Sequence, residues 1–256
     1  MGCDITVRTD GRGTIMRLHT REWGAGDRIA LLIHGIMSDH RTWRRVGPAL
    51  AENGYRVIAV DLRGHGASER AAEYSIPLFA ADLEENLPVG ADLAIGHSLG
   101  GLSLSFAVEH LRPRRAVYSD PAWALETGER PTNPETLRAL RKATRSMIAN
   151  FNPHWDEGDV DAEVAGIAAW DPATADAVGG EYAIDYIPER PVVPSLVQAA
   201  DPSHVVSEAH KEQLRAAGFT VHTVKNTGHS IHRDDLDGFM RSVLGWVRGE
   251  EPVGLV

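Results

Sequence analysis

The chain has 256 residues, of which 43% are hydrophobic, with a formal net charge of −10 and a mean hydropathy of −0.24. This is enough apolar sequence for one sizeable core, while no apolar run approaches the ~20 residues of a membrane-spanning helix. The acidic balance argues against nucleic acid as a partner. Cys3 is the only cysteine, which excludes an intrachain disulfide, and the first residues lack the basic and apolar regions of a signal peptide. We therefore expect a cytoplasmic protein with no membrane partner.

Strands and helices alternate along the first half of the chain. Residues 5–8 and 14–22 flank a turn-forming segment and predict a hairpin. Continuous apolar runs, typical of strands that helices cover on both faces, follow at 29–33 and 55–60. Between them lies an amphipathic helical pattern at 42–53. The alternation continues with a helix at 76–87, a strand at 91–95, a helix at 102–111 and a strand at 116–119.

The rhythm changes between residues 121 and 194, where prolines punctuate short helical patterns such as 135–149. A proline-rich connector closes this segment, and the alternation then resumes with a strand at 195–199, a helix at 208–217, a strand at 220–224 and a last helix at 236–247. This order predicts an α/β fold with a mostly parallel central sheet and helices on both faces. Residues 1–120 and 195–256 would form the core domain, and residues 121–194 an inserted helical cap.

The most specific motif of the chain is Gly96-His97-Ser98-Leu99-Gly100, which has the pattern G-x-S-x-G. It stands between a predicted strand and a predicted helix, which is the context of a nucleophile elbow. The turn is so tight that side chains at the two glycine positions would crowd it, and the serine itself is held in a strained conformation. The motif therefore predicts an exposed, reactive hydroxyl on Ser98.

Three further features accompany this elbow. His34-Gly35 ends one predicted strand, Asp61-Leu62-Arg63-Gly64-His65-Gly66-Ala67-Ser68 follows the next, and Gly228-His229 lies just before the last helix. With the elbow, these features make the chain resemble the α/β-hydrolase fold superfamily, in particular its serine-nucleophile members with a lid insertion. The resemblance covers essentially the whole length. It implies that His34 braces its loop and that residues 61–68 form a structural loop.

The resemblance also implies which residues act as the base and the oxyanion hole for Ser98. A serine hydroxyl is a poor nucleophile without a neighbouring base, and the superfamily carries its base at the position of His229, after the nucleophile and the acid in chain order. The oxyanion hole would consist of the backbone N–H groups of Ile36 and Leu99. His232 is interpreted as a helix-end residue. We expect no metal at His229 and His232, because no third ligand stands at a useful spacing.

The acid of the triad has two candidates. When the chain is aligned with the superfamily without gaps, Ser203 stands where the acid usually stands, and Asp201 lies two residues earlier. A minority of members use an acid after the strand that follows the elbow helix, which here is Asp120. We favour Asp120, at the carboxyl end of that strand. For both aspartates, ordinary turn chemistry beside a proline is the alternative explanation.

These residues predict a cofactor-independent serine hydrolase that cleaves a small or medium carboxylic ester, lactone, amide or thioester. Met37, Trp123 and Trp155 are the candidates for lining a partly apolar substrate pocket. A serine nucleophile weighs against the epoxide hydrolases and haloalkane dehalogenases of this fold, which use an aspartate. Three alternatives stay open: a C–C bond hydrolase, a cofactor-free oxygenase or lyase on the same scaffold, and a ligand-binding or receptor protein with low turnover.

Overall fold

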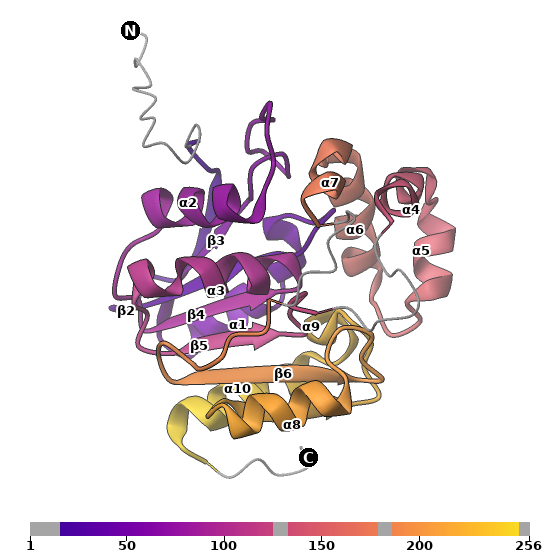
Figure 1. Ribbon diagram of the computed structural model, residues 1–256. Coiled ribbons are helices and arrows are strands. Elements are labelled where there is room, and N and C mark those ends of the chain that lie inside the picture. The colour runs from indigo at the N-terminus through magenta and orange to yellow at the C-terminus, as the bar shows by residue number, and fades with distance from the viewer. Residues whose placement is uncertain (1–15, 125–132, 179–185, 251–256) are drawn as a thin grey trace, which may run out of the picture.

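The computed structural model describes residues 16–124, 133–178 and 186–250, and a twisted seven-stranded sheet runs through its centre (Figure 1). In chain order, the strands are β1 (Thr20–Trp23), β2 (Arg28–Ile33), β3 (Tyr55–Val60), β4 (Leu93–His97), β5 (Ala116–Ser119), β6 (Ser195–Asp201) and β7 (Thr220–Lys225). They pair in the order β1-β3-β2-β4-β5-β6-β7, and only β1 is antiparallel to its neighbour. The predicted α/β fold with a mostly parallel sheet is confirmed.

Helices cover both faces of the sheet. The helices α2 (Ile76–Asn86), α3 (Leu99–Leu111) and α8 (Glu208–Ala216) pack on one face, and α1 (Val46–Glu52) and α10 (Leu236–Arg248) pack on the other. Successive side chains of a strand point to opposite faces. Leu31 and Ile33 of β2 therefore join the first core, while Ala30 and Leu32 join the second. Burial on both faces explains why the strands are continuous apolar runs.

Between β5 and β6 the chain leaves the sheet and forms a group of short helices beside it (Figure 1). These are α4 (Pro134–Ala139), η2 (Leu140–Lys142), α5 (Arg145–Phe151), α6 (Glu157–Ala169), η3 (Pro172–Thr174) and α7 (Ala175–Val178). Helix α6 packs closely against the loop after β2. A Cβ atom on Gly166 would lie 2.8 Å from the carbonyl oxygen of Met37. We call this helical group the cap and keep residues 121–194 as its proposed extent.

Salt bridges connect the cap to the core domain at the same place. The carboxylate of Asp159, in α6, accepts hydrogen bonds from Arg44 (2.8 Å) and Arg45 (3.1 Å), which lie just before α1. Glu163, one turn later in α6, pairs with Arg233 of α9 (Ile231–Asp234). Within the described ranges, no helix has the length and apolarity needed to cross a membrane.

Some predicted elements differ from the observed ones. The predicted helix at 42–53 divides into η1 (His40–Trp43) and α1, because Pro48 cannot donate a backbone hydrogen bond and is accommodated in a first turn. The pattern at 135–149 divides at Ala143, whose backbone is extended, and Thr144 then caps the new helix α5. The first strand of the predicted hairpin, residues 5–8, lies outside the described residues. Its second segment, 14–22, overlaps β1, which pairs with β3.

Candidate active site

The turn between β4 and α3 holds Ser98 in a strained backbone conformation. Strand β4 ends at His97, α3 begins at Leu99, and Ser98 between them has φ 52° and ψ −118°. A Cβ atom on Gly96 would lie 2.5 Å from the carbonyl oxygen of Gly100, and one on Gly100 would lie 2.3 Å from that of Ile33. Both positions therefore require glycine, since larger residues would push α3 away from the strands. Strain of this kind is characteristic of functional sites.

The loop after β2 passes directly beside this turn. A Cβ atom on Gly35 would lie 3.0 Å from Nδ1 of His97 and 3.1 Å from Cβ of Ser98, so a larger residue would crowd both side chains. The buried His34 ring holds this loop, because its Nε2 accepts a hydrogen bond from the Leu62 amide (3.0 Å) and its Nδ1–H donates to the Gly35 carbonyl oxygen (2.7 Å). Burial lowers the pKa of His34, which keeps the ring neutral in this role.

Two backbone amides lie on the segments that flank Ser98. Leu99 is the first residue of α3, and the first amides of a helix have no acceptor within the helix. Ile36 follows Gly35 in the loop after β2, immediately before Met37, which has a positive φ of 63°. The two amides belong to the segments that the sequence predicted, and the close approach of Gly35 to Ser98 brings those segments together.

The structure brings His229 and Asp120 together. The Nδ1–H of His229 donates a hydrogen bond of 2.7 Å to Oδ2 of Asp120, which is fully buried after the end of β5. The other carboxylate oxygen, Oδ1, accepts from the Ala200 amide (3.1 Å) and from the Ser203 hydroxyl (2.7 Å). Asp201 ends β6 and is exposed, and among the described hydrogen bonds none joins its side chain to His229. The geometry therefore pairs His229 with Asp120.

Two further histidines lie behind His229. The Nε2–H of His97 donates to the carbonyl oxygen of His229 (2.9 Å), and the two rings are 4.8 Å apart. Burial and then the neighbouring His229 lower the pKa of His97 well below its usual value, so its ring supports the loop as a neutral donor. His232 is buried on α9, where its Nε2 hydrogen-bonds the Thr42 hydroxyl (2.7 Å) and its ring packs against Trp43.

The predicted pocket residues occupy different surroundings. Met37 packs against the cap helices. Trp155, in the cap before α6, donates its indole N–H to Asp234 (2.9 Å) and lies 4.4 Å below the guanidinium group of Arg233. Trp123 is only 2% exposed and packs between Tyr118 and Phe219 in the core. These contacts are those of a core side chain, so we do not propose Trp123 as a pocket residue.

Sequence reasoning did not identify two residues that support the histidine and the acid. Ser203 bonds Asp120, and its only signal was that it stood at the usual position of the acid. Asp234 accepts a hydrogen bond of 2.7 Å from the amide of Gly228, next to His229, as well as that of Trp155. No pattern in the sequence distinguishes Asp234 from the other acidic residues near the last helix.

Known proteins share this arrangement of elements. The sequence profile described as "Alpha/beta hydrolase family" matches residues 30–241. The chain belongs to this family. An epoxide hydrolase of Caballeronia sordidicola is 32% identical over 188 residues, which are 70% of this chain and 55% of that protein. The lipase LipV of Mycobacterium tuberculosis is 32% identical over 180 residues, which are 66% of this chain and 63% of the lipase.

Solved structures of alpha/beta hydrolases show the same fold. The N-formylmaleamic acid deformylase of Pseudomonas putida superposes with a TM-score of 0.74 at 22% identity, over 90% of this chain and 96% of that one. At this identity the likeness establishes the fold alone. The chain spans between about a quarter and about two thirds of the length of its curated relatives.

Proposed function

We propose that this alpha/beta hydrolase is a serine hydrolase that cleaves a small or medium carboxylic ester, lactone, amide or thioester through an acyl-enzyme on Ser98. The observation that carries the proposal is the 2.7 Å hydrogen bond between His229 and Asp120 in a chain that places a serine at a strained elbow. A buried carboxylate on Nδ1 fixes the tautomer in which the other ring nitrogen, Nε2, can accept a proton.

In the first half of the reaction, the Ser98 hydroxyl attacks the carbonyl carbon of the substrate while Nε2 of His229 takes its proton. Asp120 stabilises the imidazolium that forms. Negative charge develops on the carbonyl oxygen, and the amides of Ile36 and Leu99 stabilise it. Loss of one such donor typically lowers turnover by about 10² to 10³. His229 then gives its proton to the leaving alcohol, amine or thiol, and the acyl-enzyme remains.

In the second half, a water molecule attacks the acyl carbon and His229 takes a proton from that water. The ester bond to Ser98 breaks, the serine recovers its proton from His229, and the carboxylic acid leaves. His229 can exchange protons with water because its side chain is 39% exposed. The cycle needs no other reactant than water.

The identity of the nucleophile favours acyl transfer over epoxide opening, although epoxide hydrolases are among the relatives. An aspartate that opens an epoxide forms an ester, and water can hydrolyse that ester to release the diol. Ser98 would form an ether in the same step. Neither water nor His229 can cleave an ether readily, so a serine would be alkylated and inactivated after one turnover.

The cap would bound the substrate pocket on the side opposite the elbow. Met37 lies in the loop after β2, where it packs against the two apolar clusters of the cap that contain Trp170 and Ile167. Trp155, an aromatic residue of the cap, is connected to the loop that carries His229, because both bind the Asp234 carboxylate. An apolar wall of this kind suits the acyl or alcohol portion of a partly apolar substrate. We therefore propose Met37 and Trp155 as pocket residues.

The test is labelling with a fluorophosphonate, read by intact mass, together with turnover of p-nitrophenyl esters, lactones and thioesters. The wild type should gain one adduct, and Ser98→Ala should gain none and lose at least about 10³-fold in turnover. Ser146→Ala, which removes an exposed hydroxyl of α5, is the matched control and should behave as the wild type. Activity of Ser98→Ala within tenfold of the wild type would exclude the acyl-enzyme. Labelling without turnover of any substrate would favour a binding protein.

A further inference from the structure

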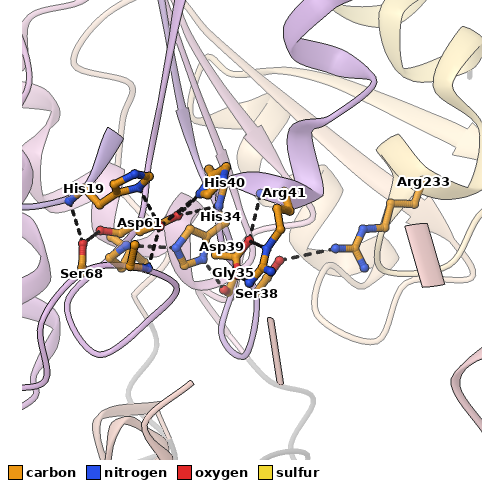
Figure 2. Close-up of polar contacts among 12 residues, drawn as sticks. His19, His34, Gly35, Ser38, Asp39, His40, Arg41, Asp61, Ser68 and Arg233 are labelled. Atoms are coloured by element: carbon orange, nitrogen blue, oxygen red, sulfur yellow. Dashed lines mark hydrogen bonds and ion pairs between the residues drawn. The ribbon is translucent and has the colours of Figure 1, made fainter. Parts of the chain in front are cut away.

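A second group of chemistry-bearing side chains consists of His19, His40 and Asp61, which we call the His-His-Asp cluster (Figure 2). The Nδ1 atom of His19 lies 3.0 Å from Oδ2 of Asp61. The Nδ1 atom of His40 lies 2.9 Å from Oδ1 and 3.1 Å from Oδ2 of the same carboxylate. One ligand atom from each residue lies within 4.8 Å of the others. The three residues come from different segments: before β1, at the start of η1 and after β3.

We propose that the His-His-Asp cluster binds a divalent transition-metal ion, with Zn²⁺ as the representative ion. Two imidazole nitrogens and one carboxylate oxygen are a donor set that zinc accepts, with water in the fourth position. Bonds of about 2.0 to 2.1 Å in a tetrahedral site separate neighbouring donor atoms by roughly 3.3 Å. The observed nitrogen–oxygen separations of 2.9 to 3.1 Å need to widen by a few tenths of an ångström. The two imidazole nitrogens, which lie within 4.8 Å of each other, need to reach the same separation on binding.

Backbone contacts hold the three ligands in place before any ion binds. The Asp61 carboxylate is buried and accepts from the amides of His40 (2.6 Å) and Ala67 (2.9 Å). The Asp61 amide donates to the carbonyl oxygen of His19 (2.9 Å). Ser68 accepts from the His19 amide and donates to the carbonyl oxygen of Asp61 (2.8 and 2.6 Å). Hydrogen bonds of this kind to a ligating carboxylate orient the ligand and are typical of metal sites.

Charge and access also favour a cation. Asp39 and Arg41 lie next to the cluster and neutralise each other through a hydrogen bond between Nε and Oδ1 (2.8 Å; Figure 2). The Asp61 carboxylate, whose side-chain partners are the two imidazoles, supplies the negative charge of the cluster. The side chains of His19 and His40 are 40% and 21% exposed, so an ion and its water ligand can reach them from solvent.

Such an ion would join three segments of the chain rather than enter the reaction. One of them is the loop after β2, which carries Ile36 and, four residues later, His40. The proposal does not depend on the hydrolase activity, and it can be tested on a protein whose Ser98 is mutated. Its effect should be stabilisation of the native state, because an ion that binds only the folded chain shifts the unfolding equilibrium.

The test is isothermal titration of the Ser98→Ala protein with ZnCl₂, with thermal unfolding as a second readout. We expect one Zn²⁺ per chain and a higher unfolding midpoint. His19→Gln and His40→Gln should each weaken this binding at least tenfold. His110→Gln, which removes an exposed histidine of α3, is the matched control and should bind as the parent does. Mg²⁺ should not bind at the same concentration, because imidazole ligands suit zinc rather than magnesium.

Two outcomes would overturn the proposal. The first is the absence of a one-to-one Zn²⁺ binding step in the parent protein. The second is a binding step whose dissociation constant stays the same in both His19→Gln and His40→Gln, which would place the ion at other histidines. Both variants change partly exposed side chains, so circular dichroism and an intact unfolding transition can establish that they fold.

Discussion

The hydroxyl of Ser203 donates a hydrogen bond of 2.7 Å to Asp120, the carboxylate that also receives the Nδ1–H of His229. Ser203 stands where members of the α/β-hydrolase superfamily usually carry their acid. The register of the sheet explains the contact, since Ser119 of β5 pairs with Gln198 of β6 and the chain continues past both residues at the same edge. Asp120 therefore lies just after the end of β5, and the loop after β6 contributes a hydrogen-bond donor to its carboxylate.

This pairing predicts that the two candidate acids differ sharply. Asp120→Asn should reduce kcat by about 10⁴, because an amide in place of the carboxylate no longer fixes the required tautomer of His229. Asp201→Asn should stay within twofold of the wild type, since the Asp201 side chain is exposed at the end of β6. The measurement is kcat on an activated ester, with unfolding curves to establish that both variants fold. A severe loss in Asp201→Asn alone would reverse the assignment.

Ser203 should have a smaller, indirect effect. Ser203→Ala removes a donor from a buried carboxylate, and such hydrogen bonds contribute about 1.5 to 3 kcal/mol. Because Ser203 acts through Asp120, we expect kcat to fall by about tenfold with little change in KM, and Ser203→Thr to restore most of the loss. Steady-state kinetics of the two variants test this prediction. Equal activities of Ser203→Ala and the wild type would show that Ala200 alone positions the carboxylate.

The cap should influence the loop that carries His229 through Asp234, because Asp234 accepts hydrogen bonds from both Trp155 and the amide of Gly228. Asp234→Ala removes both hydrogen bonds and should lower kcat and raise KM. Trp155→Phe removes only the bond from the cap and keeps a ring below Arg233, so its effect should be smaller. Asp237→Asn changes an exposed acid nearby and serves as the control. If Asp234→Ala matched this control in both constants, the connection would have no role in turnover.

The sequence predicted the sheet well because burial on both faces gives continuous apolar strands, and it located the elbow because only glycine fits beside Ser98. It favoured Asp120 as the acid, but no pattern in the sequence excluded Asp201. Both aspartates precede a proline at a strand end, and only the lateral placement of the strands decides which one meets His229. The sequence also could not show whether Trp123 packs in the core or lines the pocket, because aromatic residues in both places have similar spacing along the chain.

The His-His-Asp cluster was equally invisible in the sequence. His19 and Asp61 are 42 positions apart, and no spacing rule connects ligands that come together only because β1 pairs with β3. The salt bridges of Asp159 to Arg44 and Arg45 pose the same difficulty, since they join positions more than 100 residues apart. Local patterns identify elements and motifs, whereas contacts across the sheet edge depend on the completed topology.

Buried histidines should make the protein sensitive to mild acid. Burial lowers the pKa of His97 and His232 well below the ordinary value of about 6.5, so both stay neutral in the native state. Below pH 6.5 the unfolded chain binds protons at these positions and the folded chain does not. The free energy of unfolding therefore falls as the pH decreases, by up to about 1.4 kcal/mol per pH unit for each such histidine.

His232→Gln isolates one of these contributions. The variant should be less stable at pH 7.5, because it loses the packing against Trp43. Between pH 6.5 and 5 its free energy of unfolding should fall less steeply, because unfolding takes up about one proton fewer than in the wild type. Asp61 does not interfere, because a carboxylate with a lowered pKa loses its contribution only as the pH falls through about 4 and below. Urea unfolding at several pH values measures the slope, with the exposed His110→Gln as control. A slope in His232→Gln equal to that of the wild type would mean that His232 becomes protonated in the native state, and that the acid sensitivity arises at other groups.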